Sequence, residues 1–260
     1  MGSAGIQGPL WGGAAEDWAA VQEGLCQPLW LDVLKAAGAG PGVRLLDAGC
    51  GAGGAGVEAA RLGCDVTGVD ASVELLAIAR RRLPDARFQE GDLEQLPFPD
   101  AFFDAAVAIN TLFFAHDMDR AAREVARVVR PGGRLVVSGR GSPEACDLAA
   151  FGVSLRPLLP DNVNAPMPGR LSTIDEIVTL IESVGLHVVA RGTTRCDFHY
   201  ADRAACWRGL ASAGPVRAAL QHAGEAAVRA LFADFAGRHL TPEGAVLLRN
   251  TYVWAAADRL

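Results

Sequence analysis

The chain has 260 residues, half of them hydrophobic and 21% charged, which is typical of a globular protein with one α/β domain and appendages, or two small domains. The net charge is −6 and the pI about 5.4, and one basic triplet, Arg80 to Arg82, lies near the end of a predicted helix, where cations suit the dipole. These features disfavour a nucleic-acid substrate.

The cysteines and the apolar runs predict neither a metal site nor a membrane anchor. The six cysteines contain no C-x-x-C pair, so neither a zinc site nor a disulfide framework is indicated. No cationic segment followed by an apolar one stands at the N-terminus, and no apolar run reaches the length of a membrane span. We expect a cytoplasmic protein without metal and without a membrane partner.

The first 41 residues predict an N-terminal helical cap. Met1 to Gly13 is rich in glycine and is expected to be mobile or to form a lid. Ala14 to Leu25 and Pro28 to Ala37 have apolar residues at helical spacing, and Gly-Ala-Gly-Pro stops the second helix. A main domain over residues 42–260 follows.

The most informative stretch is a strand followed by a glycine-rich turn. Val43 to Leu46 is a short apolar run that predicts a buried strand, and Asp47 ends it. Gly49, Gly51 and Gly53 follow, and a helix is predicted after them. Such a turn lets a ligand approach the backbone beside the free N–H groups of a helix start, so the pattern indicates a nucleotide-binding loop.

Two kinds of ligand fit this loop. Gly51, Gly53 and Gly56 satisfy GxGxxG, which in a strand–turn–helix unit suggests a dinucleotide. Counted from Asp47, the same residues give Asp-x-Gly-x-Gly-x-Gly, which resembles motif I of the class I S-adenosylmethionine-dependent methyltransferases. S-adenosylmethionine carries an ammonium and a sulfonium and no pyrophosphate, so a carboxylate at the loop suits it and repels a dinucleotide.

Two further acids follow predicted strands. Asp70 closes the strand that begins at Asp65, and it follows Gly53 by 17 positions, close to the offset of a ribose-binding acid; the alternative is a helix cap. The next residue, Ala71, is also expected to contact the cofactor. Asp92 ends the third strand. The sequence Gly-Asp-Leu, in which Leu93 is the last residue, resembles the family pattern in which the acid accepts from the adenine amino group. A plain surface turn is the alternative there.

The fourth strand, Phe103 to Ile109, is followed by Asn110 at the sheet edge where ligands bind. Enzymes that methylate bases of nucleic acids commonly show (Asn/Asp)-Pro-Pro-(Tyr/Phe) there, and this chain has the asparagine without the prolines. We therefore set aside a base methyltransferase. Arg-Pro-Gly-Gly before the fifth strand, Arg134 to Ser138, also resembles the small-molecule methyltransferases.

The resemblance covers residues 42–139 and four motifs, and it implies a bacterial small-molecule methyltransferase of class I. The fold implied is α/β and Rossmann-like: a seven-stranded, doubly wound, mostly parallel sheet with helices on both faces and the last strand antiparallel between the fifth and sixth. An aromatic residue of the cap, Trp11 or Trp18, is expected over the sulfonium. The cofactor is S-adenosyl-L-methionine, and its expected contacts are Trp18, Asp47, Gly49, Gly51, Gly53, Asp70, Ala71, Asp92, Leu93 and Asn110.

The last part of the chain predicts a lid and the remaining elements. A proline-rich insertion at about residues 141–171 is expected to cover the edge of the sheet. The other predicted elements are a helix from Thr173 to Val184, a strand from Leu186 to Arg191 with possible continuation to Phe198, helices at Asp202 to Leu210, Val216 to His222 and Glu225 to Ala236, and a strand from Ala245 to Ala256.

The expected activity is methyl transfer to a small, largely apolar metabolite, as in natural-product biosynthesis, by a chain that is a candidate homodimer. His116 is the first candidate general base and His199 the second; a structural or solvated histidine is the alternative for both. A cofactor-binding protein with different chemistry, such as cyclisation, or a binding module stays open. An NAD-dependent reductase would need Tyr-x-x-x-Lys, which neither Tyr200 nor Tyr252 begins.

Overall fold

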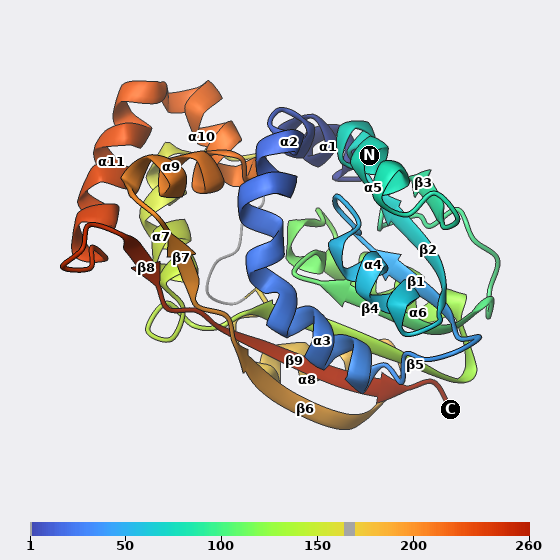
Figure 1. Cartoon of the computed structure of the whole chain (residues 1–260). Coiled ribbons are helices and arrows are strands. Elements are labelled where there is room, and N and C mark those ends of the chain that lie inside the picture. Colours follow the sequence, from blue (N-terminus) through green and yellow to red (C-terminus); the bar gives the residue numbers. More distant parts are fainter. Residues whose placement is uncertain (1, 164–169) are drawn as a thin grey trace.

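The computed structural model describes residues 2–163 and 170–260, and its centre is a seven-stranded sheet (Figure 1). The strand order is β3 (Arg87–Glu90), β2 (Asp65–Asp70), β1 (Arg44–Ala48), β4 (Phe103–Ile109), β5 (Val129–Arg140), β9 (Thr251–Asp258) and β6 (His187–Arg195). Strand β9 runs antiparallel to both of its neighbours, and the pairs from β3 to β5 are parallel. The predicted fold class and the place of the last strand are confirmed.

Helices cover both faces of this sheet, because its central strands are apolar on both sides. Leu45 of β1 belongs to a core with α3 (Gln27–Ala36) and α4 (Gly54–Arg61), whereas Leu46 belongs to a core on the opposite face. That second core contains α6 (Met118–Val128) and α8 (Ile174–Ser183). Helix α5 (Val73–Arg82) packs against β2 and β3 at the edge of the sheet. The carboxyl ends of the parallel strands are thus held at one edge.

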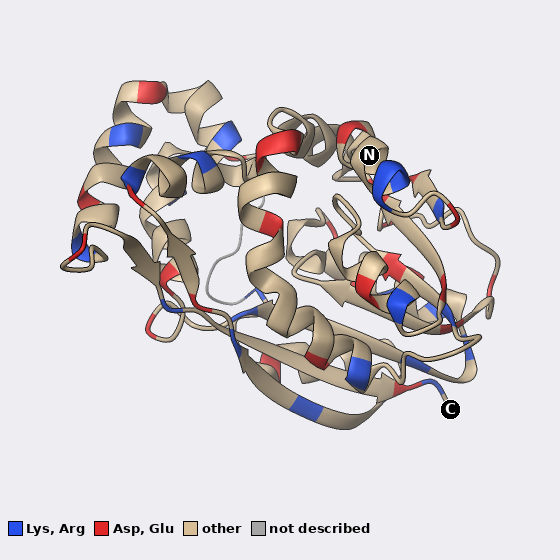
Figure 2. Cartoon of the chain, viewed as in Figure 1, with Lys and Arg blue, Asp and Glu red and all other residues tan. Residues whose placement is uncertain are grey.

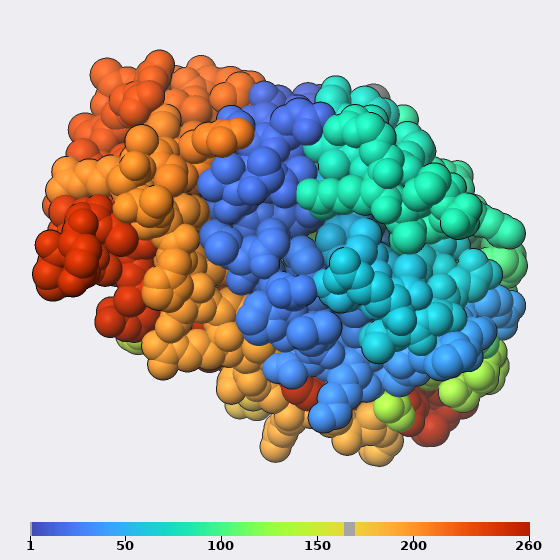
Figure 3. All heavy atoms as spheres, in the orientation of Figure 1, coloured from blue at the N-terminus to red at the C-terminus, as the bar shows by residue number. Residues whose placement is uncertain are grey.

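The N-terminal cap differs from its prediction in detail. The glycine-rich start, expected to be mobile or a lid, forms helix α1 (Ala4–Gly12), which packs against α5 and against α10 (Gly214–Ala223). The single helix predicted from Ala14 to Leu25 is divided into α2 (Ala15–Asp17), a π-helical turn η1 (Trp18–Gln22) and a 3₁₀ turn η2 (Glu23–Cys26). Figure 3 shows these residues, in blue, packed between the C-terminal helices and the cyan segment after β1.

A helical layer lies beside the sheet and contains part of the expected lid (Figure 1). The proline-rich insertion contains α7 (Asp147–Leu155) and a 3₁₀ turn η4 (Arg156–Leu158); its residues 164–169, with Pro166 and Pro168, lie outside the described residues. Helix α7 packs against α10 and α11 (Glu225–Arg238), and α9 (Arg203–Ala211) packs against η1. The C-terminal helices are therefore joined to the cap.

The predicted strand from Ala245 to Ala256 is wrong as a single element. It is divided into β8 (Val246–Leu248), which pairs with β7 (Phe198–Tyr200) in a second sheet, and β9, which joins the large sheet. The break lies at Asn250, whose buried side-chain oxygen accepts from the backbone N–H of Leu148 at 2.9 Å. The side chain of Asn250 is thus hydrogen-bonded to α7, and the strand is interrupted at this residue.

Figure 2 shows the Lys and Arg residues and the Asp and Glu residues interspersed along the ribbon. In residues 2–163 and 170–260 no helix is long and apolar enough to cross a membrane. The same residues contain no cluster of three or more His, Cys, Asp or Glu side chains placed to hold a metal ion.

Candidate functional site

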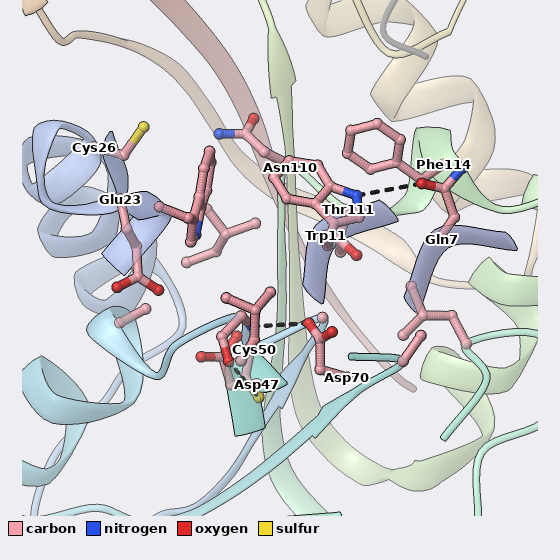
Figure 4. Close-up of a pocket in the computed structure, with 18 of the residues that line it drawn as sticks. Gln7, Trp11, Glu23, Cys26, Asp47, Cys50, Asp70, Asn110, Thr111 and Phe114 are labelled. Carbon is pink, nitrogen blue, oxygen red and sulfur yellow. Dashed lines mark hydrogen bonds between the residues drawn. The ribbon is translucent and has the colours of Figure 1, made fainter. Parts of the chain in front are cut away.

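A cavity lies at the carboxyl ends of the parallel strands, beneath the N-terminal helices (Figure 4). It has about 1170 Å³ of empty space, part of it open to solvent. Nine of the ten residues predicted to contact the cofactor line it: Trp18, Asp47, Gly49, Gly51, Asp70, Ala71, Asp92, Leu93 and Asn110.

Gly53 is the predicted cofactor residue that does not line the cavity. It precedes α4 with φ of 82°, and a Cβ there would lie 2.9 Å from the Cβ of Ala79 in α5. Close packing of two helices therefore accounts for this glycine. Gly51 differs, because a Cβ there would lie 3.3 Å from Glu23 Oε1, on the wall of the cavity. A side chain at Gly51 would take space from a ligand.

The three acids of the predicted site converge because they follow three adjacent strands. Asp47 lies in β1, Asp70 ends β2, and Asp92 follows β3. The carboxylate of Asp70 is fixed in place, since one oxygen accepts from the N–H of Gly51 at 2.8 Å and the other from the N–H of Ser72 at 2.9 Å. Each oxygen keeps a second lone pair for a ligand hydroxyl. Figure 4 shows Asp47 and Asp70 side by side beneath the aromatic side chains.

Asp47 is the acid without a partner. Its side chain is 2% exposed, and its Oδ2 atom has no hydrogen-bond partner in the described part of the chain. Burial, and then the negative charges of Glu23 and Asp70, raise the pKa of Asp47 to about 7. The side-chain oxygen of Asn110, at the end of β4, is also buried without a hydrogen bond. Two buried acceptors on one cavity wall favour a ligand that brings donors, above all a cationic one.

Glu23 is a member of the site that the sequence reasoning missed. Its Oε1 accepts from the N–H of Ala52 at 2.9 Å and, at 3.5 Å, from that of Gly54 at the start of α4, while Oε2 pairs with Arg82 at 2.5 Å. Burial raises the pKa of Glu23, and Arg82 and the two amides oppose that rise. The amides that a pyrophosphate would need are therefore already bound to a carboxylate, which argues against a dinucleotide.

We expect Glu23→Ala to destabilise the protein by about 3–5 kcal/mol, because it leaves the charge of Arg82 and the loop amides without their partner. Urea denaturation measures this loss. Glu16→Ala is the matched control: it removes an ion pair to Arg81 between the same cap and the same helix, but both side chains are more than half exposed. That control should stay within about 1 kcal/mol of wild type, and equal losses in the two variants would contradict a stabilising role for the contacts of Glu23 with Arg82 and the loop amides.

An aromatic cluster closes the cavity from the cap side. The rings of Trp11 and Trp18 meet edge to face at a centroid distance of 4.7 Å, and Trp11 meets Phe114 in the same way at 5.3 Å. The indole N–H of Trp11 donates to Gln7 at 3.2 Å (Figure 4). All four side chains line the cavity. Ring faces near a buried carboxylate suit a ligand with a positive centre.

The structure brings neither candidate histidine to the cavity. His116 is exposed just before α6, and its backbone N–H, held by Glu94 Oε1 at 2.8 Å, points inward. His199 is the exposed middle residue of β7, because alternation along that strand turns Phe198 and Tyr200 into the core. Phe198 lines the cavity and His199 does not.

The wall beyond Asn110 contains residues that no motif indicated. Cys26 donates through its thiol to the hydroxyl of Tyr252 at 3.5 Å, and both lie beside Leu148 and Arg140. Burial raises the pKa of Cys26 to about 12 and raises that of Tyr252 far above its usual value, so both are protonated near neutral pH. Among the described residues, this wall offers no general base. The contacts join segments 226 positions apart, so spacing gave no signal.

Comparisons with known proteins agree with this geometry. Residues 46–137 match the family model described as a methyltransferase domain. The demethylmenaquinone methyltransferase of Renibacterium salmoninarum is 40% identical over 111 residues, which are 43% of this chain and 47% of that protein. The chain thus spans about half the length of the curated relatives it matches.

Solved structures share the fold over most of the chain. A putative methyltransferase from Bacillus halodurans superposes with a TM-score of 0.63 at 14% identity, over 88% of this chain and 98% of that one. The cyclase SpnF superposes with a TM-score of 0.57 at 23% identity, over 89% and 81% of the two chains. At these identities the likeness shows the fold alone.

The sheet order and the acid-lined cavity at the carboxyl ends of the parallel strands define a Rossmann-like fold. Residues 46–137 are similar to the methyltransferase domain of the class I S-adenosylmethionine-dependent methyltransferases. The cofactor of this family is S-adenosyl-L-methionine, and the cavity fits it, because the unpaired oxygen of Asp47 lies where a cationic ligand is favoured and the loop amides are closed to a pyrophosphate.

Proposed function

We propose that the protein transfers the methyl group of S-adenosylmethionine to a small, largely apolar metabolite. The observation that carries the proposal is the buried, unpaired carboxylate of Asp47 beside a glycine loop whose amides are held by Glu23 and Asp70. Such a site attracts an ammonium and rejects a phosphate.

Three groups of residues would hold the cofactor. Asp70 would accept from the ribose hydroxyls, and Asp92 with the N–H of Leu93 would contact the adenine. Asp47 would pair with the ammonium of the amino-acid part. Trp18, beneath Trp11, would lie against the sulfonium, where cation–π attraction contributes about 0.5–2 kcal/mol. The division into an N-terminal cap of residues 1–41 and a methyltransferase domain of residues 42–260, and the lid role of the insertion at about residues 141–171, are part of the same proposal.

Catalysis would rest on positioning rather than on a base. The bound cofactor would supply a methyl group attached to a sulfonium, and its sulfur would leave as a neutral thioether. The aromatic cap and the apolar wall of Phe198 and Leu148 exclude water and orient the acceptor, and orientation of this kind contributes on the order of 7–11 kcal/mol. The described lining shows no base at the acceptor wall, so we assign no catalytic role to His116 or His199.

Methyl transfer is tested with S-adenosylmethionine labelled in its methyl group. We expect label to move into an organic extract when the protein is given a panel of small aromatic and prenyl hydroxyls, amines and carboxylates, with one S-adenosylhomocysteine formed per methyl group. Asp70→Asn serves as the negative control. Because the same fold is found in a cyclase, binding of the cofactor without label transfer to any acceptor would overturn the proposal in favour of other chemistry.

A further inference from the structure

Arg140 is a cation in the cavity that the cofactor does not explain. It is the last residue of β5, it is partly buried, and it lies directly opposite Tyr252 in the register of β5 and β9, so both side chains share one face of the sheet. Among the residues that the structure describes, its guanidinium has neither a hydrogen bond nor an ion pair. Arg134, on the same strand and the same face, pairs with both oxygens of Asp258.

Arg140 also lies at the junction of two hollows. A second hollow, with about 450 Å³ of empty space that includes open solvent, shares Arg140, Trp18, Gln22 and Leu148 with the main cavity. The rest of its wall is apolar and comes from the helical layer: Phe151, Gly152, Leu155, Leu210, Ala213, Pro215 and Val216. A molecule that fills this hollow would be apolar along its body and would have Arg140 beside it.

The acids of the cofactor site lie on other strands. In the sheet order β3-β2-β1-β4-β5, Asp70 and Asp47 belong to β2 and β1, and Arg140 ends β5. Two strand spacings separate β1 from β5, which is about 10 Å between strand axes. The cavity thus has a negative side, suited to the ammonium and sulfonium, and a separate positive position on the acceptor side.

We propose that the methyl acceptor carries an anionic oxygen group, a carboxylate or a phosphate, that pairs with Arg140 while its apolar body occupies the second hollow. A planar guanidinium pairs with either group through two parallel hydrogen bonds, and apolar walls strengthen the attraction. This inference rests on the proposed function and narrows its substrate class.

The test compares three probes of similar size on the protein saturated with S-adenosylhomocysteine: benzoate, phenyl phosphate and neutral benzyl alcohol. We expect an anion to bind at least tenfold more tightly than the alcohol in titrations followed by NMR, and the better anion identifies the group. Arg140→Gln should remove this preference, and Arg140→Lys should keep part of it. Arg191→Gln, which removes an exposed charge of β6, should leave it unchanged.

The outcomes separate this inference from the proposed function. The inference is overturned if the alcohol binds as well as the anions, if neither anion binds, or if Arg140→Gln keeps the preference. It is also overturned if Arg140→Gln weakens S-adenosylhomocysteine binding by the same factor, because Arg140 would then hold the carboxylate of the cofactor. If the wild-type protein does not bind S-adenosylhomocysteine, the proposed function fails, and anion preference measured without it still decides the role of Arg140.

Discussion

Asp70→Asn is expected to weaken S-adenosylhomocysteine binding by about 100-fold. The variant keeps one oxygen for a backbone N–H, so the loop stays folded, but it loses the charge and presents an NH₂ group where the ribose hydroxyls need an acceptor. Two hydrogen bonds to a charged group contribute about 1.5–3 kcal/mol each, and the loss of one or two of them corresponds to this factor. Calorimetric titration measures it.

The control for this variant lies on the same strand. Asp65→Asn changes an exposed acid at the opposite end of β2, outside the cavity, and should bind S-adenosylhomocysteine as the wild type does. Thermal unfolding of both variants establishes that they are folded. If Asp70→Asn bound within threefold of wild type, Asp70 would be only the cap of the turn before α5, and the ribose assignment would be wrong.

Asp47→Asn is expected to change stability and binding in opposite directions. Because the pKa of Asp47 is raised to about 7, the folded protein retains a proton that the unfolded chain loses near pH 4. The wild type therefore loses stability as the pH rises from about 4 to 7, and the variant does not. At pH 8 the variant should be more stable by on the order of 2–4 kcal/mol, measured by urea denaturation at both ends of this range.

The binding half of this prediction has its own pH dependence. The ammonium of S-adenosylhomocysteine needs Asp47 in its ionised form, so wild-type affinity should rise by about tenfold between pH 5.5 and 7.5. Asp47→Asn should bind more weakly at pH 7.5 and lack this rise. A variant that is less stable than wild type at pH 8, or that keeps the pH dependence, would show that Asp47 is not the buried acid that receives the cation.

The fold was predictable because its signals are local. Asp47, Asp70 and Asp92 each stand at the end of a predicted strand, and the adjacent places of these strands in the sheet bring the acids to one edge. The division of the last strand could not be predicted, because it depends on a hydrogen bond between Asn250 and Leu148, 102 positions away. The breaks in the cap likewise follow from tertiary contacts: Glu23 turns toward the glycine loop, and Gln22 accepts from Tyr200.

The cofactor side of the site was predictable to a larger extent than the acceptor side. Eight of the ten expected residues line the cavity beside the end of a strand, and Trp18 lines it from the N-terminal cap. Glu23, Arg140 and Tyr252 have no motif, and each reaches the cavity through packing between distant segments. The two histidines were chosen for their place after strands, but strand alternation turns His199 outward and a helix start exposes His116.

The most direct test of the central claim is a calorimetric titration of the purified protein with S-adenosylhomocysteine and, separately, with NADH. The cationic tail of the first ligand matches the unpaired acid of β1, and the pyrophosphate of the second meets amides that Glu23 already occupies. We predict a dissociation constant in the micromolar range for S-adenosylhomocysteine and no binding of NADH. Binding of NADH without binding of S-adenosylhomocysteine would contradict the account.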